Sequence, residues 1–417
     1  MLFPPIISLF FLSIGNGFLM TLLPLRLTDV HYSLTTIGYV SSAYYVGLCL
    51  GALFNNRLLK RAGHIRCYAT FAAVLSACAL AQSLAITPWY WFLLRVGCGW
   101  GIAGAFLVVE SWLLASSTSS NRGRVLAIYM IACFASMAFG QLFIGQLNTP
   151  LGSSEQSLPF ICAALVTSLC VIPVTLIPRN GPEIGTARAI APWNMFRLSP
   201  TGTGGSLATG ILMGAVFTLL PVYLNEISGG HQGALVGRMM FMSIIGGMVL
   251  QYPAGRWSDK SDRQWVLLVM SLGLAVCAAL LPAVQFSWTI MGVVLFFLGG
   301  GIFSLYPITI SHSADRVSPE HLVGMTQGLI LTNAVGSAIA SPLYTPLMNL
   351  LGPNGLFAGM SALLLVMAAF FVWRRACRPA PEPETTFTTF PTNSVSGSQY
   401  SQEARDLYQK GAEQDGL

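Results

Sequence analysis

Long apolar stretches, interrupted by short charged, polar or Pro/Gly-rich segments, run through most of the chain. A helix that crosses the hydrocarbon core of a bilayer needs about 20 apolar residues. Twelve stretches of roughly this length predict an all-α membrane protein with twelve transmembrane helices, each boundary being uncertain by about two to four residues. The predicted spans cover residues 4–27, 35–56, 67–86, 89–115, 124–147, 158–177, 205–225, 234–256, 265–285, 288–311, 323–347 and 353–373.

The composition supports this interpretation. Of the 417 residues, 54% are hydrophobic and only 9% are charged, and the mean hydropathy is +0.66, whereas about a quarter of the residues in soluble domains are charged. The net charge of +6 could indicate nucleic-acid binding. Because the basic residues stand at the ends of apolar stretches, they indicate membrane orientation instead, and nucleic acid is excluded as a partner.

The basic residues lie almost entirely in alternate loops. All of the 21 Lys and Arg residues except Arg26, Arg95 and Arg238 fall in the even-numbered loops or in the C-terminal segment. Lys and Arg are enriched in cytoplasmic loops, so the sequence predicts a multi-pass membrane protein with both termini in the cytoplasm. Residues 375–417 are polar and rich in Pro, Ser and Thr, which predicts a disordered cytoplasmic tail.

The two halves of the chain share short segments at a nearly constant separation of about 200 residues. Such a repeat predicts two six-helix bundles, residues 1–177 and 205–374, joined by a cytoplasmic loop at 178–204, with a pathway between the bundles. The matched pairs are Thr21–Leu27 with Thr218–Leu224, Gly38 and Gly47 with Gly237 and Gly246, and Gly99 and Gly101 with Gly299 and Gly301.

One loop carries a recognisable signature. The segment Gly255–Arg263, GRWSDKSDR, resembles the loop 2/3 signature of the major facilitator superfamily, G-x-x-x-D-[RK]-x-[GD]-R. In the first half, Lys60 stands where Asp259 stands in the second half, so the two loops are expected to make different contacts. The resemblance implies the twelve-helix fold of that superfamily and a transport function.

Three further segments narrow the resemblance. Val108–Ser111, Asn121–Arg124 and the pair Gly140, Gln141 look like the YcaD group of bacterial major facilitator proteins. The resemblance covers roughly residues 5–375, omits the tail and implies an inner-membrane transporter.

Arg95 is an ionisable residue inside a predicted span. Such residues are costly in the membrane and each is a candidate functional site. Arg95 begins the run Arg95-x-x-x-Gly99-x-x-x-Ala103, with small residues on one helical face. It is predicted to face the central cavity, where it attracts an anionic group of the solute or influences a proton-carrying site. The alternative is a structural arginine that binds backbone carbonyls or extends toward the interface.

Glu110 lies fifteen residues further along the same span, about 22 Å deeper at 1.5 Å per residue. This depth places it near the cytoplasmic loops, where it could act as a latch that pairs with Arg57, Arg61 or Arg124 when the cytoplasmic side closes. A static salt bridge is the alternative. The predicted cytoplasmic gate comprises Arg57, Lys60, Arg61, Glu110, Arg124, Asp259, Lys260, Asp262 and Arg263.

Polar residues within spans are candidates for solute contact, although packing between helices explains each of them equally well. The predicted cavity residues are Asn16, Arg95, Tyr129, Gln141, Tyr306, Gln327 and Asn333. No acidic residue or histidine stands at mid-span. This favours facilitated diffusion, or symport of a solute that carries the charge itself, over proton coupling through Glu110 or through Asp29 or Glu226 at the outer ends of their spans. A proton-coupled drug or metabolite efflux antiporter is the alternative function.

Residues typical of enzymes and metal sites are scattered. The nine cysteines form no C-x-x-C pair and the five histidines no H-E-x-x-H motif, so we expect no disulfide framework, metal, cofactor or enzymatic activity. The sequence therefore predicts a monomeric secondary transporter that moves a small solute by alternating access in the lipid bilayer, with a coupling proton as an open alternative. A non-transporting membrane sensor is a further alternative.

Overall fold

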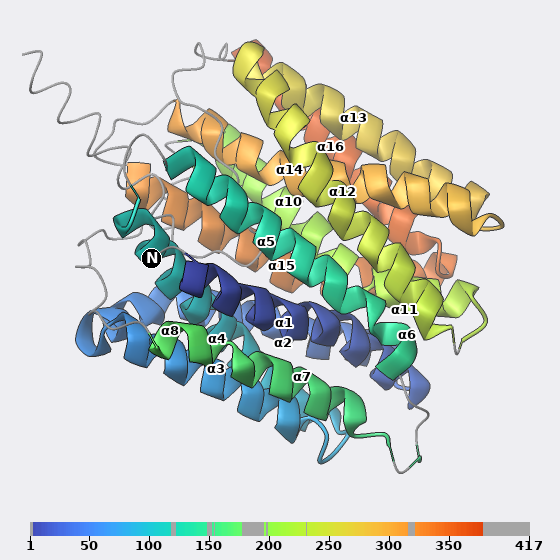
Figure 1. Cartoon of the computed structure of the whole chain (residues 1–417). Helices are drawn as coiled ribbons and strands as arrows, with labels where there is room; N and C mark the ends of the chain where they lie inside the picture. Colours follow the sequence, from blue (N-terminus) through green and yellow to red (C-terminus); the bar gives the residue numbers. More distant parts are fainter. Residues whose placement is uncertain are drawn as a thin grey trace, which may run out of the picture.

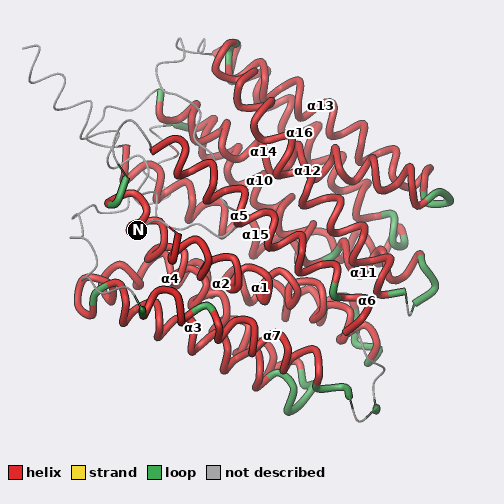
Figure 2. The backbone as a smooth tube through the Cα atoms, viewed as in Figure 1, coloured by secondary structure: helices red, strands yellow, loops and turns green. Residues whose placement is uncertain are grey.

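The structure, a computed structural model, shows an α-helical bundle. The structure describes residues 3–117, 122–147, 152–153, 155–176, 196, 199–230, 232–315 and 322–377. Within these ranges every regular element is a helix (Figure 2). The helices run side by side, and their connections gather at the two ends of the bundle (Figure 1). Most of the predicted central loop, and the predicted tail from residue 378 onward, lie outside the described residues.

Helices α1 to α8 form the first half of the chain and α10 to α16 the second half. The first half contains α1 (Phe3–Asp29), α2 (Leu34–Ala62), α3 (His64–Ala81), α4 (Pro88–Ala115), α5 (Arg122–Leu142), α6 (Ile144–Leu147), α7 (Leu158–Leu169) and α8 (Val171–Thr175). The second half contains α10 (Pro200–Thr218), α11 (Leu220–Ile227), α12 (Gly233–Lys260), α13 (Arg263–Leu280), the 3₁₀ helix η1 (Leu281–Val284), α14 (Trp288–Ala314), α15 (Leu322–Leu351) and α16 (Gly355–Cys377).

These helices confirm the predicted fold class. Ten helical spans in the described ranges are long and apolar enough to cross a membrane, and the bent pair α10 and α11 makes an eleventh. The 30-residue helix α15 packs against α10 and α2 and completes the bundle. Every predicted span is occupied by helix.

Some predicted spans are interrupted or displaced. The chain bends by 41° between α10 and α11, because Pro221 has no N–H to donate and its ring clashes with the preceding turn. Helix α10 also begins at Pro200, five residues earlier than predicted, and shortens the predicted central loop of 178–204. Ser199 explains the early start, because its side chain accepts a hydrogen bond from the Gly202 N–H and caps the helix.

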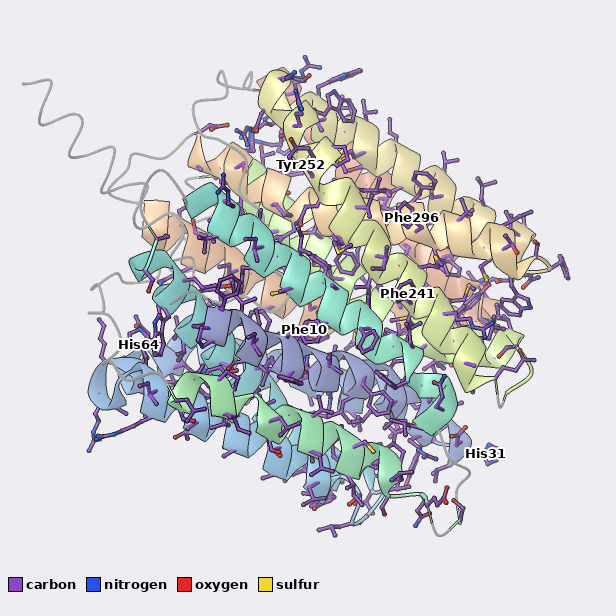
Figure 3. The ribbon with its side chains drawn as sticks, viewed as in Figure 1. Phe10, His31, His64, Phe241, Tyr252 and Phe296 are labelled. Atoms are coloured by element: carbon purple, nitrogen blue, oxygen red, sulfur yellow. The ribbon has the colours of Figure 1, made fainter. Side chains whose placement is uncertain are left out.

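Two ends of the bundle differ in their connections. At one end of the bundle α2 is followed by α3, α12 is followed by α13, and α16 comes to its end. We call this the basic end and the opposite end the distal end. His64 and His31 mark these two ends in Figure 3. The halves meet mainly where α2 packs on α15 and α5 packs on α12.

Close contacts between the halves lie near the distal end. Among the described glycines, Gly38 approaches Ser341, Gly145 approaches Ala234, and Gly237 approaches the carbonyl of Gln141. A Cβ atom at any of the three would collide with the opposite half. The two halves are therefore in close contact near the distal end.

Glycines also determine how helices cross within each half. Gly47 of α2 lies against the α4 backbone at Val96, and Gly246 of α12 lies against the α14 backbone at Phe296. A side chain at either glycine would overlap the neighbouring carbonyl. The α2–α4 and α12–α14 pairs therefore cross at matched points of the repeat.

Candidate functional site

Arg95 is completely surrounded by protein. It lies in the second turn of α4 and is 1% exposed. Its Nη2 donates to Met20 Sδ at 2.9 Å, and its guanidinium lies 4.6 Å from the centre of the Tyr44 ring. Its Nε has no hydrogen-bond partner, and no described carboxylate forms an ion pair with it. The positive charge is therefore held by weak partners only.

A small cavity adjoins this guanidinium. Its volume is about 10 Å³, which is room for roughly one water molecule. The lining residues come from α1, α3, α4 and α7, all in the first half: Leu12, Asn16, Leu19, Leu75, Arg95, Cys98 and Thr167. Asn16 also donates to the Tyr44 hydroxyl at 3.2 Å. The structure thus brings two predicted cavity residues, Asn16 and Arg95, into one site.

Tyr129 lies elsewhere, beside Glu110. The Tyr129 hydroxyl on α5 donates to Glu110 Oε1 on α4 at 2.6 Å, and both side chains are buried. The short distance is typical of a hydroxyl bound to a carboxylate. Tyr129 therefore joins the Glu110 site and not the cavity beside Arg95.

Gln141 and Asn333 bind neighbouring helices. Gln141 on α5 accepts from the Thr21 hydroxyl at 2.6 Å and donates to the Gly17 carbonyl at 2.7 Å, both on α1. Asn333 on α15 donates to the Ser206 carbonyl of α10 at 3.1 Å. These bonds fit the packing alternative stated for both residues. Of the remaining cavity candidates, Tyr306 is buried on α14 and Gln327 is half-buried on α15.

The predicted basic gate residues of the first half reach solvent or lipid. Arg57, Lys60, Arg61 and Arg124 are all exposed, as is Lys260 in the second half. The buried Glu110 carboxylate receives the Tyr129 hydroxyl in this conformation.

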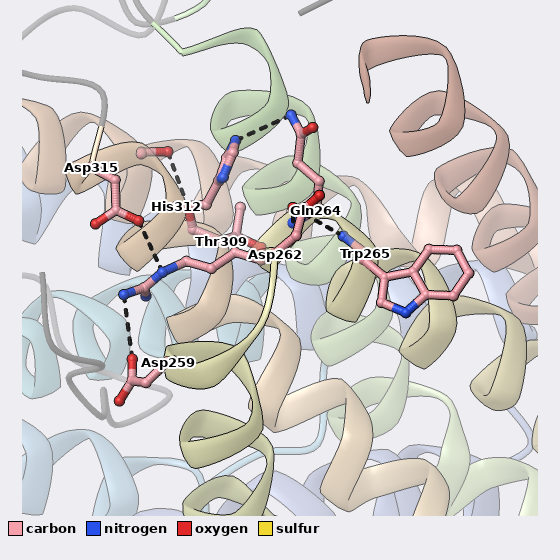
Figure 4. Close-up of polar contacts among 9 residues, drawn as sticks. Asp259, Asp262, Gln264, Trp265, Thr309, His312 and Asp315 are labelled. Carbon is pink, nitrogen blue, oxygen red and sulfur yellow. Dashed lines mark hydrogen bonds and ion pairs between the residues drawn. The ribbon is translucent and has the colours of Figure 1, made fainter. Parts of the chain in front are cut away.

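Arg263 is the centre of a buried ionic network in the second half (Figure 4). Its Nε lies 2.9 Å from Asp315 Oδ2, and its Nη2 lies 3.3 Å from Asp259 Oδ1. Asp262 accepts from the Gln264 N–H at 2.8 Å, which caps α13, and it pairs with Arg375 at 3.1 Å. Three of the four predicted residues in this loop, Asp259, Asp262 and Arg263, thus take part in ion pairs.

Some residues of these sites were not predicted. Met20 and Tyr44 contact Arg95, and Asp315 pairs with Arg263. Met20 and Tyr44 carry no charge, so nothing in their local sequence distinguishes them from packing residues. Asp315 directly follows α14, and an acidic residue opposite the basic signature loop was a usable signal.

Within the described residues, no group of three or more His, Cys, Asp or Glu side chains could hold a metal ion. The polar groups at Arg95 are a cation, an amide and hydroxyls, which suit an organic or inorganic anion more than a metal ion.

The bundle of membrane-crossing helices with a buried charged site defines the class as a multi-pass membrane transporter. The family model described as Major Facilitator Superfamily matches residues 6–341 and 233–400. The chain belongs to the major facilitator superfamily, within the YcaD-like group, and it is a transporter of a small solute.

Two relatives cover nearly the whole bundle. The uncharacterized MFS-type transporter YcaD of Escherichia fergusonii is 33% identical over 367 residues, which are 86% of this chain and 93% of that protein. The uncharacterized MFS-type transporter Ent638_1421 of Enterobacter sp. strain 638 is 31% identical over 375 residues, or 90% and 96% of the two chains.

Solved structures share the fold at low identity. A D-xylose–proton symporter aligns with a TM-score of 0.69 and 13% identity over 93% of this chain and 99% of its own. A mutant of the nucleoside transporter NupG aligns with a TM-score of 0.72 and 14% identity over 89% and 98%. A bacterial homolog of the human lysosomal transporter Spinster, inward-facing and occupied, gives 0.67 and 15% over 90% and 96%.

Proposed function

We propose that this transporter moves a small solute with a negative charge across the bacterial inner membrane, and that Arg95 and Asn16 bind the charged group. The observation that supports the proposal is the buried Arg95 guanidinium, whose described partners are a thioether and an aromatic ring. A buried cation without a counter-charge is destabilising. An anionic solute supplies that counter-charge, and the Asn16 amide adds a hydrogen-bond donor.

The solute enters in another conformation. The cavity beside Arg95 has room for about one water molecule, so α1, α3, α4 or α7 must move before a solute fits. All lining residues of this cavity belong to the first half, so in our proposal the rocking of residues 1–177 against residues 205–374 is accompanied by a shift of helices within the first half. Both termini face the cytoplasm. The interdigitated glycines at the distal end support a state that is closed on the outer side.

The basic end then contains the gate. We propose that Glu110 exchanges its Tyr129 hydroxyl bond for contacts with Arg57, Arg61 or Arg124 when the basic end closes. Asp259, Asp262 and Arg263 connect α12 and α13 to their neighbours, with the exposed Lys60 and Lys260 at the corresponding surfaces.

The test compares anionic and neutral solutes on the purified protein. A thermal-shift screen selects ligands that raise the unfolding midpoint by mass action, and counterflow in liposomes then measures transport of each hit. Anionic hits should dominate. Arg95→Ala should reduce their counterflow at least about tenfold, because a charge-assisted hydrogen bond is lost.

Arg95→Lys is expected to retain part of the activity, because it keeps the charge. Arg238→Ala removes an exposed arginine on α12 and serves as the matched control with unchanged counterflow. Wild-type transport by Arg95→Ala, at equal amounts of folded protein, would contradict the proposal.

Glu110 supports a second candidate, proton coupling. It is a buried carboxylate hydrogen-bonded to a hydroxyl. One of the solved structures with the same fold is a D-xylose–proton symporter. If Glu110 carries the coupling proton, an imposed pH gradient should drive uptake in the wild type but not in Glu110→Gln, while counterflow persists in both. Uptake that does not respond to the gradient selects facilitated diffusion.

A further inference from the structure

Two exposed tryptophans and two arginines gather at the basic end of the second half. Trp265 in the first turn of α13 is 45% exposed, and Trp373 near the end of α16 is 58% exposed. Arg374 and Arg375 directly follow Trp373. Helices α13 and α16 pack against each other along their length. We call Asp262, Trp265, Trp373, Arg374 and Arg375 the α13–α16 patch.

Contacts within the patch hold both guanidinium groups in place. The Arg375 guanidinium lies 5.4 Å from the centre of the Trp265 ring, and its Nε pairs with Asp262 at 3.1 Å. The Arg374 guanidinium lies 5.6 Å from the centre of the Trp373 ring. An arginine oriented by an aromatic ring and an ion pair loses less side-chain entropy when it binds a further group.

The patch has donors left for a ligand. The ion pair with Asp262 uses the Nε of Arg375, and 46% of the Arg375 side chain stays exposed. The Nε of Arg374 is buried, so the N–H groups at the end of its guanidinium are the ones considered for a ligand. The remaining N–H groups of both arginines can bind phosphate oxygens.

The charge of the patch is positive. In and next to the patch, Lys260, Arg263, Arg374 and Arg375 carry four positive charges, and the carboxylates of Asp259, Asp262 and Asp315 carry three negative charges. A surplus of cations beside exposed indole rings, at the end of membrane-crossing helices, is the arrangement that suits an anionic lipid headgroup at the interface.

The corresponding end of the first half is built differently. Helix α8, the last helix of that half, ends at Thr175, and residues 171–176 contain no aromatic or basic side chain. Helix α3 begins with His64, Ile65 and Arg66 and carries no tryptophan there. Among the described residues of the basic end, the combination of indole rings and oriented guanidinium groups therefore occurs at α13 and α16 and not at α3 and α8.

We propose that the α13–α16 patch binds the headgroup of an anionic phospholipid in the leaflet at the basic end. In this arrangement Arg374 and Arg375 bind the phosphate oxygens, and Trp265 and Trp373 lie along the glycerol region and the upper acyl chains. The lipid is a ligand separate from the transported solute, so this inference stands independently of the proposed function.

Native mass spectrometry of the full-length protein in detergent tests the proposal. The protein is titrated with cardiolipin, phosphatidylglycerol and phosphatidylethanolamine, and the bound lipids are counted. The two anionic lipids should bind more tightly than phosphatidylethanolamine. In Arg374→Gln/Arg375→Gln, the affinity for cardiolipin should fall about tenfold or more, and the binding of phosphatidylethanolamine should not change.

A matched control removes the same charge elsewhere at the basic end. Arg61→Gln/Arg66→Gln alters two exposed arginines of the first half. Neither makes a cation–π contact within the described part of the chain, so the change should leave cardiolipin binding as in the wild type. An equal loss in this control, or no loss in Arg374→Gln/Arg375→Gln, overturns the proposal. Trp265→Ala keeps every charge and should still weaken cardiolipin binding, which separates the patch from a simple effect of net charge if the double variant folds poorly.

Discussion

The third helix begins at the basic end in both halves of the chain, but its first residue makes different contacts. In the first half, His64 opens α3 and lies 3.0 Å from Ser111 near the end of α4. In the second half, Arg263 is the first residue of α13 and pairs at 2.9 Å with Asp315, which directly follows α14. One corner thus uses a neutral hydrogen bond and the other a buried ion pair to connect equivalent helices.

Each corner also buries a carboxylate, with different support. Glu110 receives the Tyr129 hydroxyl from α5, so the carboxylate of the first half connects two consecutive helices. Asp315, with 2% of its side chain exposed, receives a full positive charge. A hydrogen bond from an uncharged hydroxyl can be exchanged during a conformational change at lower cost than a buried ion pair. The comparison predicts a first-half corner that rearranges and a second-half corner that stays rigid.

The largest expected effect is that of Arg263→Ala. Removing the guanidinium leaves the buried Asp315 carboxylate without its ion-pair partner, which costs about 3–5 kcal/mol of stability. The unfolding midpoint of purified protein, measured by thiol-reactive dye or by static light scattering, should fall strongly.

Asp259→Asn is the matched control for this change. The Asp259 side chain is 31% exposed and its contact with Arg263 is longer, so we expect a loss of at most about 1 kcal/mol. Equal midpoints for Arg263→Ala and Asp259→Asn would refute the assignment of Asp315 as the main partner.

Tyr129→Phe has the next largest expected effect. It deletes a hydrogen bond to a buried carboxylate while keeping the ring that packs on Phe106, and the expected loss is about 2 kcal/mol. If the first-half corner rearranges during transport, the counterflow rate of this variant changes as well, whereas Arg238→Ala leaves it unchanged. A variant with full stability and wild-type counterflow would remove Tyr129 from the gate.

Ser111→Ala has the smallest expected effect. The Ser111 hydroxyl donates to the Val108 carbonyl at 2.9 Å, so it accepts from His64 at the other contact. Its loss removes one neutral hydrogen bond and should cost about 1 kcal/mol. Comparison of the thermal unfolding midpoints of Ser111→Ala and Arg263→Ala checks which corner contributes more stability. A larger loss in Ser111→Ala than in Arg263→Ala would reverse the comparison.

Much of the site could be predicted from charge and depth in the sequence, but not the side-chain partners. The buried positions of Arg95 and Glu110 could be predicted because both residues stand within one apolar stretch. Ionisable residues in membrane spans almost always face the interior of the bundle and are candidate functional sites. Tyr129 and Gln141 were predicted as cavity residues from polarity alone, yet Tyr129 binds Glu110 and Gln141 joins α5 to α1. A polar side chain within a span can bind a solute or a neighbouring helix, and the local sequence does not distinguish the two roles.

The sequence by itself determined the approximate number and limits of the apolar spans and the family. It also determined the difference between Lys60 and Asp259 in the two signature loops. These features depend on local hydrophobicity and on short motifs, which a linear chain displays directly. Only the tertiary structure decided that Arg95 lies against Met20 and Tyr44, and that Arg263 pairs with Asp315. Those partners are more than 50 residues apart along the chain, and the packing of the helices is what brings them together.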